Sequence, residues 1–206
     1  MSRIGIDIDG TIRDIYTPLI ECFKKKYPNG EVKSIKKWND YKIWKHFKND
    51  DKIIDEDVFK KFWFDGSYTN EIYRDYSLLY ENVLKGLYLL KKDGHKIILI
   101  SAQSNDNTKA LTMEWLGDTV LYQDLVDEIH FTEYETKGNV LCDIYIEDSP
   151  KQLEFLLDSS NYLRYSDLYV MDRPWNQNAI GTRVKDMVNF YNSATTRCYY
   201  HLIKEK

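Results

Sequence analysis

Short apolar runs that end in polar residues recur along the chain and alternate with helical patterns. Isoleucines at positions 4, 6 and 8 alternate with other residues, which favours a β-strand. Residues 96–100, Lys-Ile-Ile-Leu-Ile, are almost wholly apolar, as is typical of a strand buried on both faces. The same reasoning predicts further short strands at residues 128–132, 143–147 and 168–171.

Helical patterns separate these strands. The first follows residue 82, and its predicted buried face consists of aliphatic residues at helical spacing, Val83, Leu84, Leu87 and Leu90. Gly94 suits the end of this helix, because glycine readily adopts the left-handed conformation found there. The next helix is expected to begin near residue 106, to carry Leu111 and Trp115, and to stop at Gly117.

Another helix is predicted after residues 143–147. Ser149 suits the N-cap, Pro150 the first helical position and Gln152 the third residue of a capping box. Its predicted buried stripe is Leu153, Leu156 and Leu157, and a last helix is expected over about residues 184–192. This alternation of strands and helices indicates an α/β fold with a Rossmann-like parallel sheet covered by helices on both faces.

Residues 15–80 differ from the rest of the chain. They hold half of its aromatic residues and show no strand alternation. Trp38, Tyr41, Trp44 and Phe47 recur every three residues, near helical spacing. We therefore predict a small helical cap of residues 15–80, inserted into a core made of residues 1–14 and 81–206. Most of its rings are expected to pack together, and a few to border a pocket.

Charge and cysteine content narrow the possible functions. The 206-residue chain has a net charge of −4 and a pI of about 5.6, so tight binding to long nucleic acids is not favoured. The three cysteines lack metal-binding spacing and are expected to be reduced thiols in a cytoplasmic protein. No apolar run approaches the length of a membrane span, so no membrane association is expected.

Acidic and hydroxyl residues stand where predicted strands end. Asp7 and Asp9 would share one face of an extended strand, where a cation or a shared proton would relieve their repulsion. After the sharp turn that the next glycine permits, Thr11 can offer a backbone N–H and a hydroxyl to an anion. Ser101 and Asp148 also fall at strand ends, and parallel sheets bind ligands beyond the carboxyl ends of their strands.

With Lys137 and the Glu147-Asp148 pair, these residues resemble the four motifs of the haloacid dehalogenase (HAD) superfamily, in the same order. The resemblance implies a phosphatase in which Asp7 attacks phosphorus to form an aspartyl-phosphate and Asp9 protonates the leaving group. It implies phosphate binding by Thr11, Ser101, Ala102 and Lys137. It also implies Mg²⁺ bound by Asp7, the backbone carbonyl of Asp9, and Asp148; Glu147 stands where many relatives have a first aspartate.

A narrower likeness is to the 5'(3')-deoxyribonucleotidase group. It rests on Asp14 closing the first motif, on the cap position and on the segment Asp172-Arg-Pro-Trp-Asn176. It implies a 5'-nucleotidase of nucleoside monophosphates, whose base would stack on cap aromatics, with Trp38, Tyr41, Trp44 and Trp63 as candidates. The alternatives are another HAD small-molecule phosphatase, a polynucleotide 3'-phosphatase and a phospho-accepting signalling domain. Receiver domains carry the accepting aspartate on a middle strand, which disfavours the last.

Overall fold

The computed structural model describes residues 1–64, 66–119, 124–159, 163–164 and 167–204. Its largest element is a six-stranded sheet in which all paired strands are parallel. The spatial order is β11 (Thr182–Val184), β10 (Leu168–Met171), β9 (Ile144–Glu147), β1 (Arg3–Ile6), β7 (Lys96–Ser101) and β8 (Glu128–Phe131). The five predicted strands are therefore confirmed, and β11 is an additional one.

Helices pack on both faces of this sheet, as predicted. α3 (Val83–Lys92), α4 (Asp106–Asp118) and α7 (Met187–Lys204) cover one face, and α6 (Pro150–Ser159) covers the other. The division follows the strand alternation, which in β7 sends Ile97 and Leu99 to the first face and Ile98 and Ile100 to the second. An unbroken apolar run thus fills two cores at once, which is why β7 shows no polar alternation.

The central position of β1 matters for the chemistry. β1 lies between β9 and β7, with Ile4 opposite both Ile97 and Ile144. Each of these three strands ends at the same edge of the sheet, so residues that follow them in the sequence are brought together.

Helix boundaries and faces differ from prediction in a few places. Leu84 is 41% exposed, because one residue after Val83 turns about 100° around the helix, away from the face that Val83 shares with Leu87 and Leu90. The φ of Gly94 is +80°, so this glycine ends α3 as expected. α7 extends well beyond the predicted residue 192, to Lys204.

The N-terminus of α6 forms half of the predicted capping box. The Ser149 hydroxyl accepts a hydrogen bond from the Gln152 backbone N–H at 3.4 Å, which confirms the N-cap. The Gln152 side-chain amide is buried and has no partner within the described residues, so the reciprocal bond is missing. Leu153 and Leu156 are fully buried, and Leu157 is partly so.

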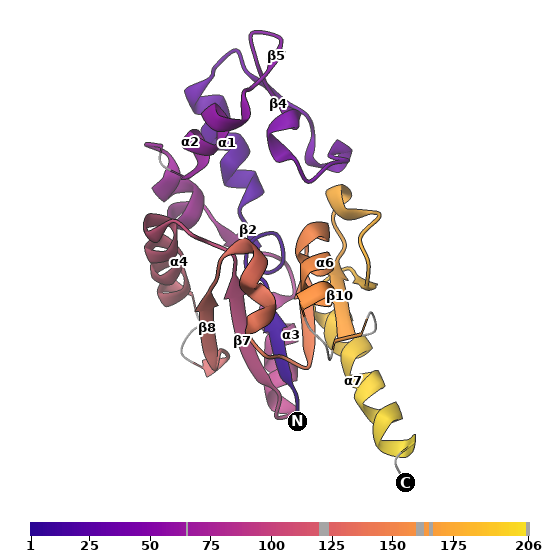
Figure 1. Ribbon diagram of the computed structural model, residues 1–206. Helices are drawn as coiled ribbons and strands as arrows, with labels where there is room; N and C mark the ends of the chain where they lie inside the picture. Colours follow the sequence, from indigo (N-terminus) through magenta and orange to yellow (C-terminus); the bar gives the residue numbers. More distant parts are fainter. Residues whose placement is uncertain (65, 120–123, 160–162, 165–166, 205–206) are drawn as a thin grey trace.

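Residues 15–80 lie over the carboxyl edge of the sheet (Figure 1). This segment, which we call the insertion, contains α1 (Tyr16–Lys26), η1 (Ile35–Lys37), η2 (Ile43–His46), α2 (Glu56–Phe64) and the π-helical turn η3 (Glu71–Asp75). It also contains a three-stranded antiparallel sheet of β3 (Glu31–Val32), β4 (Phe47–Asn49) and β5 (Lys52–Ile53). The expectation of a purely helical cap is therefore incomplete, because strands of two or three residues are too short to show alternation.

The insertion has an aromatic core that Leu111 and Trp175, from outside residues 15–80, also join. Most of its rings pack together, for example Phe23 against Phe47 and Phe62 with centroids 4.9 and 5.9 Å apart. The chain enters beside β2 (Arg13–Asp14) and leaves beside β6 (Leu78–Leu79), which pair antiparallel. Aromatic packing is thus the main role of these rings, as predicted.

Two further expectations can be compared with the structure. Cys22 and Cys142 are buried free thiols, and the side chain of Cys198 lies outside the described residues. In the part of the chain that the structure describes, no helix combines the length and apolar character that a membrane crossing needs.

The close contact between α3 and α7 yields a stability prediction. A Cβ at Gly86 would lie 2.5–2.6 Å from atoms of Met187, including its backbone. Alanine raises intrinsic helix propensity by about 1 kcal/mol, but overpacking against backbone costs about 1–3 kcal/mol. Gly86→Ala should therefore lower the melting temperature. Gly117→Ala, in α4 with nothing within 4 Å of the added Cβ, should leave it unchanged or raise it by about 2–4 °C. Equal shifts for both variants in thermal denaturation would refute this packing argument.

Candidate active site

Three carboxylates meet at the carboxyl edge of the sheet, beneath the insertion. Asp7 follows β1 directly, while Glu147 ends β9 and Asp148 follows it. One carboxylate oxygen from each lies within 4.8 Å of the others, and all three side chains are buried. The structure therefore brings Asp7 and Asp148 together as the strand pattern predicts, and it adds Glu147.

Asp7 is held by an ammonium and a hydroxyl group. The Lys137 Nζ, from η4 (Tyr134–Asn139), donates to Asp7 Oδ1 at 2.6 Å, and the Thr11 hydroxyl donates to Asp7 Oδ2 at 3.1 Å. Lys137 is only 2% exposed and also donates to Glu147 Oε2. Thr11 and Lys137 thus lie where an anion beside Asp7 would meet them.

Glu147 and Asp148 differ in how many of their carboxylate oxygens accept hydrogen bonds. Besides Lys137, Glu147 accepts hydrogen bonds at Oε1 from the backbone N–H groups of Asp148 (3.1 Å) and Ser149 (3.0 Å). Asp148 Oδ1, in contrast, is buried without a hydrogen-bond partner among the described residues. A buried carboxylate oxygen left unpaired is costly unless a proton or cation occupies it. Asp148 therefore suits a cation ligand better than Glu147 does.

The other oxygen of Asp148 is enclosed. Its Oδ2 accepts hydrogen bonds from the Trp175 indole N–H at 3.0 Å and from the Tyr16 hydroxyl at 3.2 Å. Gly10, with φ of +82°, lies on the remaining side, where a Cβ would come within 2.1 Å of Oδ2. A side chain at position 10 would displace Asp148. The glycine is therefore needed both for the turn and for the position of the Asp148 carboxylate.

The cluster contains three acidic groups and one basic group. Burial, followed by the charge of Glu147, raises the pKa of Asp7 to about 8, although Lys137 opposes the shift. Burial and the charges of Glu147 and Asp7 also raise the pKa of Asp148 well above its usual value. Burial alone would lower the pKa of Lys137, but Asp7 and Glu147 outweigh it and raise that pKa. Three carboxylates against one ammonium provide the donors and charge that suit a hard divalent cation.

Asp9 does not join this cluster through its side chain. Asp9 Oδ1 accepts from the Arg13 Nε at 2.7 Å, and Oδ2 accepts from the Gln103 amide at 2.9 Å. The expectation that Asp7 and Asp9 share a face rests on regular strand geometry, which does not extend to them, because β1 ends at Ile6 and the chain turns so tightly that Arg13 N donates to Ile8 O. The Asp9 backbone carbonyl remains a predicted Mg²⁺ ligand, because the side-chain contacts of Asp9 do not bear on it.

Arg13 is the least expected member of the site. Its side chain is fully buried and, besides Asp9, donates to the carbonyl of Tyr73 and to the hydroxyl of Thr112. It therefore links the first motif to the insertion and to α4. An arginine in a run of polar residues looks like a surface residue, so no sequence signal marks it for burial.

Ser101 and Ala102 stand beside Asp7 on the neighbouring strand. Ser101 is the last residue of β7 and is buried, while Ala102 is partly exposed. β7 pairs with β1 over Lys96–Leu99, so Ser101, at the end of β7, and Ala102, which follows it, lie at the same carboxyl edge as Asp7.

The four aromatic candidates occupy different positions. Tyr41 is close to the acidic cluster, since burial and then the charges of Asp148 and Glu147 raise its pKa well above the usual value. Trp38 is 1% exposed and packs against Tyr16 and Trp175, with centroids 5.7 and 5.8 Å away. The other two, Trp44 and Trp63, are partly buried against the aromatic core of the insertion.

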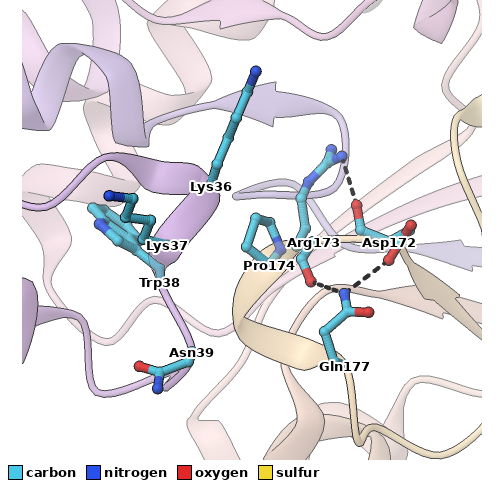
Figure 2. Close-up of a pocket in the computed structure, with 8 residues that line it drawn as sticks. All are labelled: Lys36, Lys37, Trp38, Asn39, Asp172, Arg173, Pro174 and Gln177. Atoms are coloured by element: carbon cyan, nitrogen blue, oxygen red, sulfur yellow. Dashed lines mark hydrogen bonds between the residues drawn. The ribbon is translucent and has the colours of Figure 1, made fainter.

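A pocket of about 440 Å³ opens between the insertion and the segment after β10 (Figure 2). The insertion contributes Lys36, Lys37, Trp38 and Asn39, and the other wall is Asp172, Arg173, Pro174 and Gln177. Arg173 Nε also donates to the carbonyl of Gly10 at 2.7 Å, so this wall is fixed to the first motif. The residues that line the pocket include none of the three clustered carboxylates, and they carry more cationic than anionic side chains.

Comparisons by sequence identify no relative, whereas comparisons by structure do. No protein-family model and no curated protein sequence matches the chain. The structure is similar to a Thermotoga maritima protein described as a β-phosphoglucomutase, with a TM-score of 0.61, 14% identity and coverage of 95% of this chain and 99% of that one.

Two other solved structures are similar over nearly their whole length. A haloacid dehalogenase-like hydrolase from Streptococcus pneumoniae has a TM-score of 0.52 and 12% identity, over 97% of this chain and 98% of that one. A D,D-heptose 1,7-bisphosphate phosphatase from B. bronchiseptica, solved with magnesium and phosphate, has a TM-score of 0.53 and 11% identity, over 96% and 99%. The chain therefore has the fold of haloacid dehalogenase-like hydrolases, with a parallel α/β sheet and an insertion after the first strand.

Proposed function

We propose that this chain is a phosphomonoesterase of small molecules that uses Asp7 as its nucleophile. The observation that carries the proposal is the buried Asp7 carboxylate, held 2.6 Å from Lys137 and adjacent to the unpaired oxygen of Asp148. A carboxylate, a fixed ammonium and a place for a cation are what nucleophilic attack on a phosphate dianion requires. The shared fold with phosphate-ester enzymes supports the proposal.

The reaction would proceed in two steps. An oxygen of Asp7 attacks phosphorus and the bond to the leaving oxygen breaks, while Asp9 gives that oxygen a proton. Water then attacks the phosphorus of the aspartyl-phosphate, Asp9 takes its proton, and the bond to Asp7 breaks to release phosphate. Arg13 and Gln103 each donate to one oxygen of Asp9 and fix the orientation of its carboxylate, and each oxygen keeps a second lone pair.

Mg²⁺ is the cation that we propose for this site, with Asp7, Asp148 and the Asp9 backbone carbonyl as its ligands. When bound, it would neutralise charge on the phosphoryl oxygens and allow the phosphate to approach Asp7. Lys137, together with Thr11, Ser101 and Ala102, would contact the phosphoryl group. Lys137 would also remain charged throughout, since its carboxylate neighbours raise its pKa.

The substrates that we favour are nucleoside monophosphates, with residues 15–80 acting as a cap that recognises the leaving group. The charges of Asp148 and Glu147 act on the partly buried Tyr41, and the pocket of Figure 2 has a proline and cationic side chains in its lining. A planar base gains by stacking on such rings, about 1–3 kcal/mol per base–aromatic contact. These features support a 5'-nucleotidase over an enzyme of simple phosphates.

Asp7→Asn tests the nucleophile. The amide has the same shape but is a poor nucleophile, so hydrolysis should fall by several orders of magnitude while the fold is retained. Asp143→Asn, an exposed carboxylate just before β9 at the opposite edge of the sheet, is the matched control and should keep full activity. The assay should cover nucleoside monophosphates, sugar phosphates, an aryl phosphate and 3'-phosphorylated oligonucleotides, each with Mg²⁺ and with EDTA. Activity retained by Asp7→Asn, or after exhaustive chelation, would refute the mechanism.

The raised pKa of Asp7 predicts how pH affects stability without metal. With a pKa of about 8 in the folded chain and about 4 in the unfolded chain, Asp7 binds a proton more tightly when folded. In EDTA, the melting temperature should therefore fall as pH rises from about 4 through about 8, and Mg²⁺ should reduce this loss. Asp7→Asn does not titrate at this position and should show a flatter profile. A profile equally steep in both proteins would contradict the assignment.

The base-stacking role is tested by Tyr41→Leu. Losing one stack should raise KM for a nucleoside monophosphate roughly tenfold, with turnover of a small aryl phosphate nearly unchanged. Tyr76→Leu, at an exposed tyrosine of the insertion, is the control and should change neither. Trp38, Trp44 and Trp63 can be replaced in the same way. Parallel changes for both substrates would mean that these rings serve packing alone.

A further inference from the structure

The two oxygens of Asp148 are treated differently by the fold. Oδ2 has two donors, the Tyr16 hydroxyl and the Trp175 indole N–H, and Oδ1 has none within the described residues. Both oxygens belong to a side chain that is only 1% exposed. A buried aspartate with only a structural role is expected to have hydrogen-bond donors at both oxygens.

The two donors are themselves held in place. The rings of Tyr16 and Trp175 meet edge to face with centroids 4.5 Å apart, and they are 2% and 4% exposed. Tyr16 begins α1 of the insertion, and Trp175 lies in η6 (Pro174–Asn176) after β10. The next residue, Asn176, donates from its amide to the carbonyls of Asp148 and Met171, both at 2.8 Å. The backbone of Asp148 is thus fixed along with its carboxylate.

Packing alone would not require these polar groups. Phenylalanine at either position would supply a ring, whereas a buried hydroxyl or indole N–H is costly unless it has an acceptor. Both donors point to the same oxygen, and Gly10 leaves the space that this oxygen occupies.

We infer that Tyr16 and Trp175 are positioning residues for the cation site: they anchor Asp148 through Oδ2 and leave Oδ1 for the ion. Neither residue needs to touch the ion or the phosphate. Hydrogen-bond partners of metal ligands typically change metal affinity by about 10–100-fold when they are removed. The inference rests on the proposed cation site and adds that α1 and η6 determine its affinity.

Tyr16→Phe is the sharpest test, because it removes one oxygen atom and keeps the ring. Mn²⁺ binding to the full chain, measured by electron paramagnetic resonance without substrate, should show a Kd raised roughly tenfold. Trp175→Phe should have a similar effect, and calorimetry with Mg²⁺ should rank the proteins in the same order. These readouts do not depend on turnover.

Trp115→Phe is the matched control. Trp115 is also buried, but its indole N–H donates to the carbonyl of Ser77 at 3.0 Å instead of to Asp148. The Trp115→Phe variant should be less stable than the wild-type protein but should bind Mn²⁺ with the same affinity. Wild-type affinity in both Tyr16→Phe and Trp175→Phe would overturn the inference alone. If the wild-type protein itself bound no Mn²⁺, the cation site and the inference would both be overturned.

Discussion

A single buried ammonium, that of Lys137, faces three buried carboxylates, and the arrangement around the sheet edge follows from this imbalance. Moving such charges out of water is costly, so burial and mutual repulsion raise the pKa of Asp7 and of Asp148 and favour their protonated forms until a cation is bound. The acidic side chains also accept hydrogen bonds from other groups. Backbone N–H groups donate to Glu147, a hydroxyl donates to Asp7, and a hydroxyl and an indole N–H donate to Asp148. Negative charge that these donors leave uncompensated would attract a divalent cation, and in the mechanism that we propose the bound cation would then offset the charge of a phosphate.

Much of the fold follows from local patterns in the sequence. Apolar runs such as residues 96–100 predict buried parallel strands, and parallel strands imply that Asp7, Ser101 and Asp148 meet at one edge. These predictions succeed because each depends on a few adjacent residues. β11 and the small sheet of the insertion could not be predicted, because two or three residues carry no periodic signal. Leu84 points out of the core because it lies about 100° around the helix from Val83. Counting apolar residues in the sequence does not detect this rotation.

The strand pattern could predict only those residues of the candidate site that follow strands, and Lys137, which lies in η4, was predicted only through the resemblance. Asp9 was expected on the same face as Asp7, but the turn after Ile6 directs it to Arg13 and Gln103, and neither partner has a sequence signal. The roles of Tyr16 and Trp175 depend on an oxygen atom more than 100 residues away from Tyr16 in the chain. Contacts of this kind are properties of the tertiary structure, so they become visible only when the distant segments are placed together.

The enclosure of Asp148 Oδ2 by Gly10, Tyr16 and Trp175 has a consequence for how this protein can change by mutation. Removing one member of a buried hydrogen-bonded set leaves its partner unsatisfied, whereas replacing the set together with apolar groups can be almost neutral. Single substitutions at these positions are therefore each disfavoured, although a joint replacement would be tolerated by the fold. Stepwise substitution would pass through several destabilised intermediates. Gly10, Tyr16, Asp148 and Trp175 lie far apart in the chain but should therefore be retained or lost together.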